Sequence, residues 1–419
     1  MSRVIGQTSS PTSNTKSGEV ESTYAWVRLF TALAIGTIGS IGMWSVVVAL
    51  PAVQAEFAVA RADASLPFTF TMFGFGLGAV AMGQLADRFS IVVAIICGAT
   101  SLAAGYIAAS FAPSLWMFTF ASGLVGLGAS ASFAPLLADM SHWFTKRRGI
   151  AVAIVACGNY LSGTIWPPVI QHFIETSGWR ATHFVIGLLC LATMLPLSVV
   201  LRRRIAMHLE TAESAAARGA QASLGISSNA LMALICIAGV GCCVAMSMPQ
   251  VHIVAYCGDL GYGVARGAEM LSFMLGFGII SRVASGFVAD RIGGVATLLL
   301  GSALQGVALF LYLFFDGLIS LYVISALFGL FQGGIVPMYA IIVREYFPAK
   351  QAGTRVGIAI FATIVGMAFG GWISGWIFDY TGSYRVAFLN GLAWNLMNVS
   401  IAAWLLLRTR TRATSLAHA

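Results

Sequence analysis

Twelve long apolar runs, separated by short polar or charged breaks, follow one another along this chain. A helix of roughly 20 apolar residues is enough to cross the hydrocarbon core of a bilayer, which is about 30 Å thick. The pattern therefore predicts an all-α membrane protein with twelve transmembrane helices. The expected spans are residues 26–51, 65–86, 91–111, 114–140, 149–173, 181–201, 228–256, 268–289, 295–315, 318–344, 354–378 and 385–407.

Composition strengthens this prediction, because apolar residues make up 58% of the 419 residues and charged residues only 9%. A soluble protein of this length needs far more charge on its surface. The seven cysteines and six histidines are scattered without metal-ligand spacing, so we expect no metal site and no cofactor. We also expect no enzymatic activity, because the apolar runs contain no Ser/His/Asp set and no paired carboxylates.

The basic residues predict the orientation in the membrane. If both termini are cytoplasmic, the inner segments hold eighteen Lys and Arg residues, whereas the outer loops hold only Arg61, Arg180, Arg266 and Arg385. This bias follows the positive-inside rule and predicts an even number of spans in the inner (plasma) membrane. The formal charge of +8 is therefore a topology signal. It does not indicate nucleic-acid binding, since the basic residues are not gathered on one soluble surface.

The chain divides into two similar halves. The sequence GQLADR at residues 83–88 follows the second run, and GFVADR at residues 286–291 follows the eighth, 203 residues later. Residues 143–154 and 346–360 form a second matching pair after the fourth and tenth runs. Such duplication predicts two pseudo-symmetric six-helix bundles around a central site. The expected parts are a disordered cytoplasmic tail (1–25), an N-terminal bundle (26–201), a cytoplasmic linker (202–227), a C-terminal bundle (228–407) and a second cytoplasmic tail (408–419).

The repeated Asp-Arg pairs lie too close to the cytoplasmic surface to bind a cargo at mid-membrane. An acid at the end of the fourth run and another at the end of the tenth correspond to each other in the two halves. We predict that these groups form inter-helix ion pairs on the cytoplasmic side, which hold the outward-facing state and break when the halves rock apart. The expected gating residues are Gly83, Asp87, Arg88, Asp139, Asp290, Arg291 and Glu345.

Arg282 is the one charged residue that lies well inside an apolar run. An ionised group in hydrocarbon is costly, so it normally faces a cavity or a partner and marks a pathway. All fifteen Asp and Glu residues lie in tails, in loops or at the ends of runs, so no protein carboxylate is expected at that depth. The missing counter-ion is therefore predicted to be an anionic cargo. The alternatives are a side chain that snorkels inward, or one that binds carbonyls and helix ends in the other half.

Other polar residues within the runs are candidates for the wall of the cavity. Polar side chains in apolar spans either bond across helices or line a cavity. Imidazole titrates near neutral pH, so His252 is a candidate proton acceptor or a donor to the substrate, with a structural role as the alternative. The expected substrate-binding residues are Arg282, His252, Gln332, Tyr339, Asn159 and Tyr160.

The loop at residues 83–88 and its echo at 286–291 resemble the signature loop of the major facilitator superfamily. Residues 143–153, 248–261 and 281–286 are similar to the monocarboxylate transporter and oxalate/formate antiporter branch. The resemblance implies that Arg282 binds a substrate carboxylate. Monocarboxylate carriers commonly place an acid for the coupled proton one turn earlier, where this chain has Gly278. Oxalate exchangers imply a lysine in the eleventh span, but residues 356–378 contain no Lys or Arg, which favours a monoanion.

The sequence as a whole predicts a secondary active transporter that moves a small organic monocarboxylate by alternating access. Symport with a proton is the leading mode, and exchange of carboxylate anions is a close second because of Gly278. Two other hypotheses stay open, namely an efflux carrier of a neutral or drug-like solute and a non-transporting sensor. The expected partners are the small organic anion, protons and the lipid bilayer, and we expect a monomer.

Overall fold

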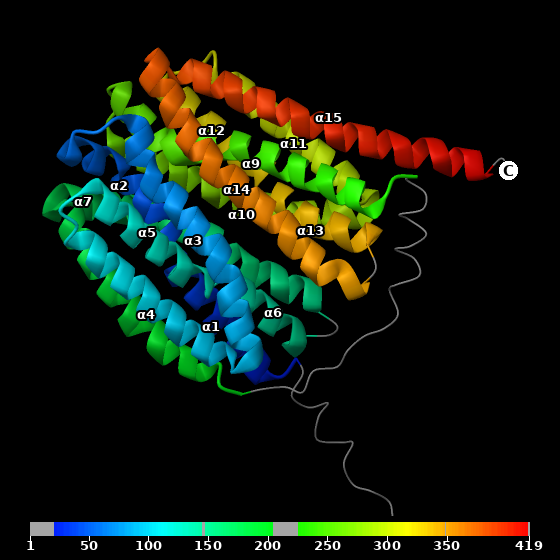
Figure 1. Ribbon diagram of the computed structural model, residues 1–419, viewed down its shortest axis with the longest axis horizontal. Helices are drawn as coiled ribbons and strands as arrows, with labels where there is room; N and C mark the ends of the chain where they lie inside the picture. Colours follow the sequence, from blue (N-terminus) through cyan, green and yellow to red (C-terminus); the bar gives the residue numbers. More distant parts are fainter. Residues whose placement is uncertain (1–20, 145–146, 204–224, 348, 418–419) are drawn as a thin grey trace, which may run out of the picture.

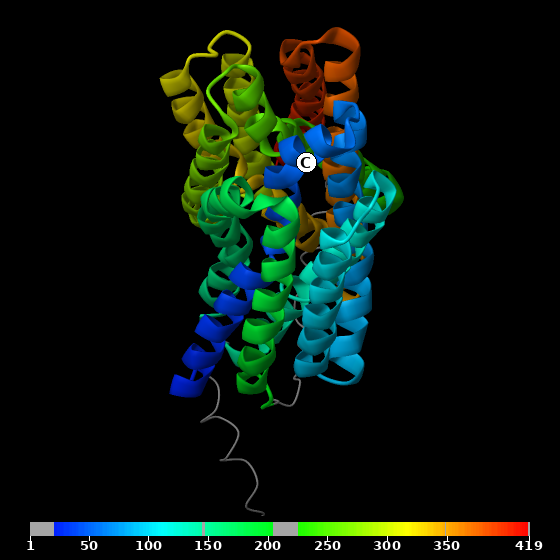
Figure 2. The same ribbon diagram turned by 90° about the vertical axis from the view of Figure 1, so that its left-hand side faces the viewer.

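The computed structural model describes residues 21–144, 147–203, 225–347 and 349–417, and no strand occurs within these ranges. Figures 1 and 2 show two bundles, one built from the blue-to-green helices and the other from the green-to-red helices. The first comprises α1 (Thr23–Gly39), α2 (Ile41–Phe57), α3 (Arg61–Arg88), α4 (Ile91–Ser110), α5 (Leu115–Ser130), α6 (Ala134–Trp143) and α7 (Arg148–Val200). The second comprises α9 (Ser228–Asp259), α10 (Val264–Ile292), α11 (Gly294–Tyr312), α12 (Leu318–Gln332), α13 (Ile335–Tyr346), α14 (Ala349–Thr381) and α15 (Tyr384–Ala417).

The described chain has eleven helices that are long and apolar enough to cross a membrane. The prediction of an all-α membrane protein is confirmed, whereas the number of twelve spans and the orientation of the termini stay predictions. One of the eleven contains an interruption, because Gly178 within the 53-residue α7 has a non-helical φ of 79° and ψ of 156°. Glycine adopts a positive φ without the steric cost that a Cβ would add. The predicted spans 149–173 and 181–201 thus lie on either side of Gly178.

Three of the predicted continuous spans are broken near their middle. Ser40 separates α1 from α2, residues 131–133 separate α5 from α6, and residues 333–334 separate α12 from α13. The first two breaks touch each other, because a Cβ on Gly39 would lie 2.4 Å from Oγ of Ser132. Broken helices free backbone N–H and C=O groups, which is tolerated at membrane depth where protein or a cavity surrounds them.

The first residues of α1 and α9 lie close to the predicted domain boundaries, whereas the last residue of α15 does not. α9 begins at Ser228, directly after the predicted linker, although linker residues 204–224 lie outside the described residues. α1 begins at Thr23, and residues 1–20 of the predicted tail also lie outside the described residues. α15 continues to Ala417, so the helix runs past the predicted end at residue 407. Figure 1 shows this extension of α15 projecting from the bundle.

Two seams join the halves, one between α3 and α14 and the other between α7 and α10. The α3–α14 seam is tight where α3 begins, since a Cβ on Gly375 would lie 3.0 Å from the carbonyl oxygen of Arg61. It is still in contact four turns later, where a Cβ on Gly76 would lie 3.2 Å from the ring of Phe361. We call the end of the molecule that holds Arg61 the closed end.

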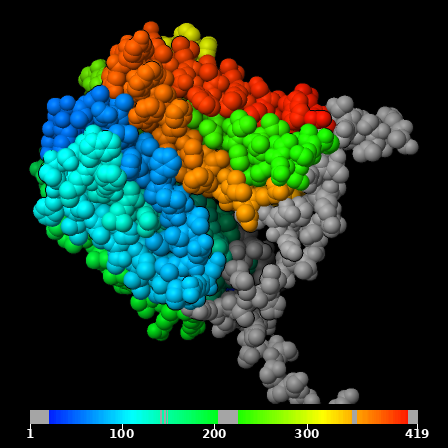
Figure 3. All heavy atoms as spheres, viewed as in Figure 1, coloured from blue at the N-terminus to red at the C-terminus, as the bar shows by residue number. Residues whose placement is uncertain are grey.

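The same two seams separate at the opposite end. A Cβ added to Gly83, on the face of α3 that carries Gly76, would meet no atom within 4 Å. The same holds for Gly357 on α14 and for Gly286 on α10. Figure 3 shows a recess between α3 and α14 in this region. We call this end the open end, and the central site described next lies between the two ends.

Candidate functional site

Arg282 joins the two halves at the α7–α10 seam. Its Nη1 donates to the carbonyl oxygen of Ala156 in the first half at 2.9 Å, and its Nε donates to that of Gly333 in the second half at 3.3 Å. The guanidinium lies over the ring of Tyr160, 4.2 Å from the centroid, in a cation–π contact. No ion pair with a carboxylate reaches Arg282 anywhere in the described chain. This half-buried cation is therefore held by neutral groups alone.

The break between α12 and α13 explains one of these partners. Gly333 follows the last residue of α12, so its carbonyl lies at an interrupted helix, where backbone groups lack regular partners. The break also lets the backbones approach closely, because a Cβ on Gly333 would lie only 2.3 Å from the carbonyl oxygen of Gly278. The glycine pair at residues 333–334 thus places a backbone acceptor beside Arg282.

Two of the predicted polar residues, Tyr160 and Gln332, lie beside Arg282, and a third, Asn159, precedes Tyr160 on α7. The hydroxyl of Tyr160 donates to Oε1 of Gln332 across the seam at 3.3 Å. Nε2 of Gln332 and Oδ1 of Asn159 are buried without a hydrogen-bond partner among the described residues. The indole of Trp44 donates to the backbone oxygen of Asn159 at 3.2 Å. A buried polar group without a partner is costly, so these two atoms are ready to accept a ligand that offers the complementary groups.

The ring of Tyr160 packs against the backbone of α10 at Gly278, where the absence of a side chain leaves room for it. A Cβ at position 278 would lie 2.3 Å from Cε1 and 2.6 Å from Cδ1 of Tyr160. The ring therefore fills the space that a side chain at this position would need. An acid one turn before Arg282, as the resemblance to monocarboxylate carriers implies, is incompatible with this position of Tyr160.

The structure places His252 far from Arg282. At 1.5 Å per helical residue, His252 lies roughly 10 Å from the closed end of α9, and Arg282 roughly 27 Å from the closed end of α10. Nε2 of the imidazole is 2.7 Å from the carbonyl oxygen of Gly371, and its Nδ1 is 3.3 Å from the hydroxyl of Tyr384. His252 is fully buried, and both partners of its ring nitrogens belong to the second half.

Tyr339 likewise points into the second bundle. Its hydroxyl donates to Oδ1 of Asn398 at 3.1 Å, and Nδ2 of Asn398 donates to Oγ of Ser302 at 2.7 Å. These bonds tie α13, α15 and α11 together inside one half. The structure thus brings Tyr160 and, through it, Gln332 to Arg282. The side chain of Asn159 instead contacts Met43, and His252 and Tyr339 lie elsewhere.

The acids predicted to act in gating have partners other than the repeated Asp-Arg pairs. Asp139 accepts two hydrogen bonds of 2.8 Å from Nε and Nη2 of Arg28, in an ion pair between α6 and α1 of the same half. Arg28 is only 1% exposed and lies over the ring of Trp143. Glu345 accepts a hydrogen bond of 2.9 Å from the backbone N–H of Gly294 at the start of α11.

The two Asp-Arg pairs lie at the open end. Asp87, Arg88, Asp290 and Arg291 are exposed, and no ion pair joins them to any described residue. Arg88 instead lies over the ring of Phe89. In this conformation, therefore, the predicted pairing of the repeated motif with Asp139 and Glu345 is not formed. Because the predicted pairs belong to the outward-facing state, their role in gating stays a prediction.

Sequence reasoning placed Arg61 in an outer loop, and this placement is wrong. Arg61 is the first residue of α3, is only 7% exposed, and forms an ion pair of 3.1 Å with Asp259 of the other half. The prediction failed because Arg61 lies in the polar break before an apolar run, where a loop residue is also expected. Asp259, at the end of another run, was the only available signal.

Two helical bundles thus meet at a half-buried cation. The chain matches the Major Facilitator Superfamily over residues 32–318 and 267–418, and it belongs to this family. It is similar to Monocarboxylate transporter 13 of Rattus norvegicus, with 28% identity over 86% of this chain and 82% of that protein. It is also similar to the Agnestins efflux protein AgnL12 of Paecilomyces divaricatus, with 25% identity over 76% of this chain and 72% of that protein.

Solved structures share the fold. A bacterial homolog of the human lysosomal transporter Spinster, in an inward-facing and unoccupied conformation, superposes with a TM-score of 0.70 at 14% identity, over 94% of this chain and 98% of that one. The nucleoside transporter NupG gives the same TM-score at 11% identity, over 91% of this chain and 99% of that one. At these identities the likeness concerns the fold alone.

Proposed function

We propose that the protein is a secondary active transporter of a small organic monocarboxylate that works by alternating access. The observation that carries the proposal is Arg282, a cation at the seam between the halves that has no carboxylate partner among the described residues. In this proposal the chain crosses the inner (plasma) membrane twelve times with both termini in the cytoplasm. The closed end then faces outward and the open end faces the cytoplasm.

The contacts of Arg282 suggest how the cargo binds. The guanidinium offers a planar fork that matches the two oxygens of a carboxylate, and charge-assisted bonds of this kind are stronger than bonds to neutral carbonyls. A carboxylate that enters from the open end therefore replaces the oxygens of Ala156 and Gly333 as the ligand of Arg282. Because Ala156 belongs to the other half, this exchange of ligands also loosens the α7–α10 seam.

We assign Tyr160, Gln332 and Asn159 to the same site. Tyr160 supports the guanidinium from one side, and Gln332 and Asn159 contribute the two polar atoms that have no partner in the described protein. His252 and Tyr339, which were also predicted to bind the cargo, lie apart from this cluster. Arg282 is a half-buried cation, and residues 356–378 of the eleventh predicted span supply no second Lys or Arg, which supports a monoanion.

Proton symport is the leading mode of coupling in this proposal, and exchange of anions is the alternative. The position of the expected acid holds Gly278, and Tyr160 fills the space around it. The two modes differ in their response to a pH gradient. Symport requires that an inward proton gradient drives accumulation of the acid, whereas exchange requires a counter-anion inside the vesicle and is indifferent to the gradient.

Efflux of a neutral solute is a second candidate, because one relative of similar identity is named as an efflux protein. The two candidates make opposite demands on Arg282. A carrier of monocarboxylates needs the guanidinium as a ligand, whereas a carrier of a neutral solute tolerates its replacement by a neutral side chain of similar length.

The test is uptake of radiolabelled monocarboxylates into proteoliposomes, with and without an inward proton gradient. We expect Arg282→Gln to abolish uptake and Arg282→Lys to retain part of it, because lysine keeps the charge and loses the fork. Arg266→Gln is the matched control, since Arg266 lies on the same helix and forms an exposed pair with Glu269. Uptake by Arg282→Gln at the wild-type rate, or no uptake of any carboxylate by the wild type, would overturn the proposal.

A further inference from the structure

Arg61 connects the first half to three helices of the second half at the closed end. Its guanidinium pairs with Asp259 at the end of α9, with both Nη1 and Nη2 at 3.1 Å from the carboxylate oxygens. Nη1 also donates to the hydroxyl of Tyr384 at the start of α15, at 2.6 Å. On α14 the ring of Phe378 lies 4.9 Å from the guanidinium carbon. One side chain of α3 thus contacts α9, α14 and α15.

A second carboxylate crosses the same boundary. Asp379 of α14 accepts hydrogen bonds from the backbone N–H groups of Arg61 at 2.8 Å and Ala62 at 2.7 Å. These N–H groups belong to the first turn of α3, where they have no partner within the helix. An acid at a helix N-terminus is further favoured by the helix dipole. In an ordinary cap the acid comes from the same chain segment, whereas here it comes from the other half.

Hydrogen bonds connect Tyr384 through His252 to Gly371, which packs against α3. The hydroxyl of Tyr384 lies 3.3 Å from Nδ1 of His252, whose Nε2 lies 2.7 Å from the carbonyl oxygen of Gly371. Gly371 packs on α3, because a Cβ there would lie 3.0 Å from the ring of Phe68. The position of His252 therefore gives it a role in supporting Tyr384 and the α3–α14 seam.

The α7–α10 seam is held by close packing and a neutral hydrogen bond. Where α7 meets α10, a Cβ on Gly163 would lie 2.1 Å from Leu275, and the hydroxyl of Ser272 donates to the backbone oxygen of Thr164. No ion pair among the described residues joins α7 to α10. The two seams occupy corresponding places in the two halves, yet the charges between the halves are concentrated at the α3 side.

We propose that Arg61, Asp259, Asp379 and Tyr384 form a latch that holds the outer side closed and breaks once in each transport cycle. The latch reinforces the closed end of the α3–α14 seam, whereas no ion pair among the described residues reinforces the α7–α10 seam. Water reaches the latch from a surface pocket of about 390 Å³ that both Arg61 and Asp259 line. The pocket supplies the hydration that separated charges need. The proposal rests on alternating access and is independent of which cargo is carried.

The latch is testable through the exposure of Thr69. This residue lies on α3 within the seam, where its hydroxyl donates to the backbone oxygen of Ala368 at 3.1 Å. A Thr69→Cys variant therefore reacts with a membrane-impermeant maleimide, supplied outside intact cells, only when the outer side opens. The same chain without Thr69→Cys measures the background from the seven native cysteines.

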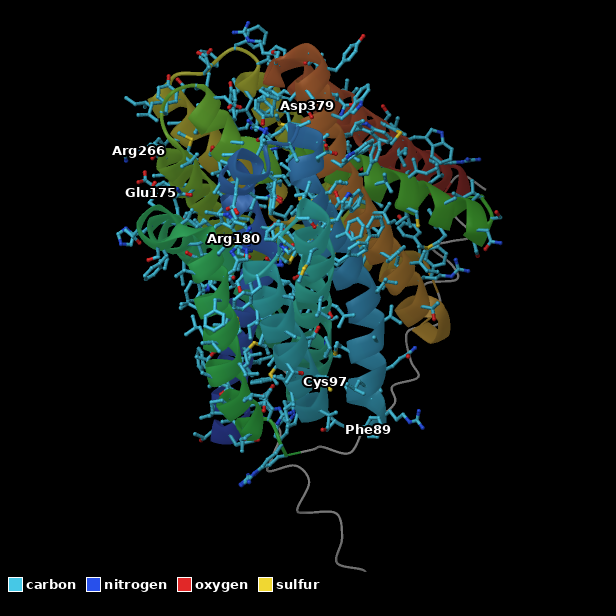
Figure 4. The ribbon with its side chains drawn as sticks, turned by 60° about the vertical axis from the view of Figure 1, so that its left-hand side comes forward. Phe89, Cys97, Glu175, Arg180, Arg266 and Asp379 are labelled. Carbon is cyan, nitrogen blue, oxygen red and sulfur yellow. The ribbon has the colours of Figure 1, made fainter. Side chains whose placement is uncertain are left out.

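We expect Arg61→Gln to raise the labelling rate of Thr69→Cys about tenfold or more, because the variant loses the charge-assisted hydrogen bonds of Arg61 to Asp259 and to Tyr384 across the seam. The matched control is Arg180→Gln. Arg180 forms an ion pair of 2.6 Å with Glu56, and both residues belong to the first half. Figure 4 shows that Arg180 and Asp379 lie toward the same end of the molecule, opposite Phe89 and Cys97. The control should leave the rate unchanged.

A second variant keeps the test decisive if Arg61→Gln does not fold. Asp259→Asn removes only the ion pair and leaves the bonds of Arg61 to Tyr384 and of Asp379 to the backbone, so a smaller rise in labelling is expected. An unchanged rate in the folded variants, or an equal rise in Arg180→Gln, would overturn the latch. The labelling experiment needs no cargo. It can therefore contradict the latch while the uptake experiment supports monocarboxylate transport, and it can support the latch while no monocarboxylate is taken up.

Discussion

Gly278→Ala adds one methyl group and is expected to lower the stability of the folded protein. The added Cβ would lie 2.3 Å from an aromatic carbon of Tyr160, whereas carbon atoms in favourable contact lie about 3.5–4.0 Å apart. Tyr160 cannot retreat freely, because it stacks on Arg282 and bonds Gln332. Extra atoms in a well-packed interior cost about 1 to 3 kcal/mol. We expect a loss of stability in this range relative to a matched glycine substitution.

Gly286→Ala is that matched substitution. Gly286 lies on the same face of α10, two turns further along, and a Cβ there meets nothing within 4 Å. Alanine is a better helix former than glycine by up to about 1 kcal/mol, so this variant should be neutral or slightly stabilised. The comparison removes the contribution of helix propensity and leaves the clash with Tyr160.

The assay is thermal unfolding of the purified variants, followed by uptake in proteoliposomes. Gly278→Ala should unfold at a lower temperature than Gly286→Ala and should transport more slowly, because the displaced Tyr160 no longer supports Arg282. A double-mutant cycle with Tyr160→Ala isolates the cause. In that background Gly278→Ala should cost almost nothing, and an undiminished cost there would refute the reasoning.

Three further predictions concern other parts of the molecule. Asp139→Asn leaves the buried Arg28 without its counter-ion, so the free energy of unfolding should fall by about 3 to 5 kcal/mol; an unchanged unfolding midpoint would contradict this. Gln332→Leu removes an unsatisfied amide and one acceptor for Tyr160, so stability should change by less than about 1 kcal/mol while uptake falls; the opposite pattern would indicate a purely structural role. Asp87→Asn should reduce uptake while the amount of folded protein in the membrane stays constant, and parallel loss of both would argue against gating.

The sequence predicted the helices well because apolar length is a one-dimensional property of the chain. It did not predict the breaks at Ser40 and at residues 333–334, since the residues there are as apolar or as small as their neighbours. These breaks depend on close contacts between helices, such as that of Gly39 with Ser132, which only the packed structure defines.

For the candidate site, too, the sequence predicted some features and not others. The depth of Arg282 was visible from its distance to the ends of an apolar run, and a bond to carbonyls of the other half was one of the alternatives that the sequence left open. The structure shows such a bond to Ala156. Which carbonyl it would be could not be predicted, because backbone carbonyls carry no sequence signal. Arg61 was assigned to a loop since it stands at the start of a span, yet tertiary contacts with Asp259 bury it. Asp139 pairs with Arg28 rather than with the repeated motif, because α6 packs against α1 within the same half.

The central claim is that Arg282 binds the carboxylate of the cargo, and ligand-induced stabilisation tests it most directly. Purified wild type and Arg282→Gln would be heated with a panel of monocarboxylates and with the uncharged amide of each acid. A ligand that binds only the folded state at 100 times its Kd stabilises it by about 2.7 kcal/mol. The account predicts that at least one acid, but not its amide, raises the unfolding temperature of the wild type and leaves that of Arg282→Gln unchanged. Equal stabilisation of both proteins by the acid, or of the wild type by acid and amide alike, would contradict it.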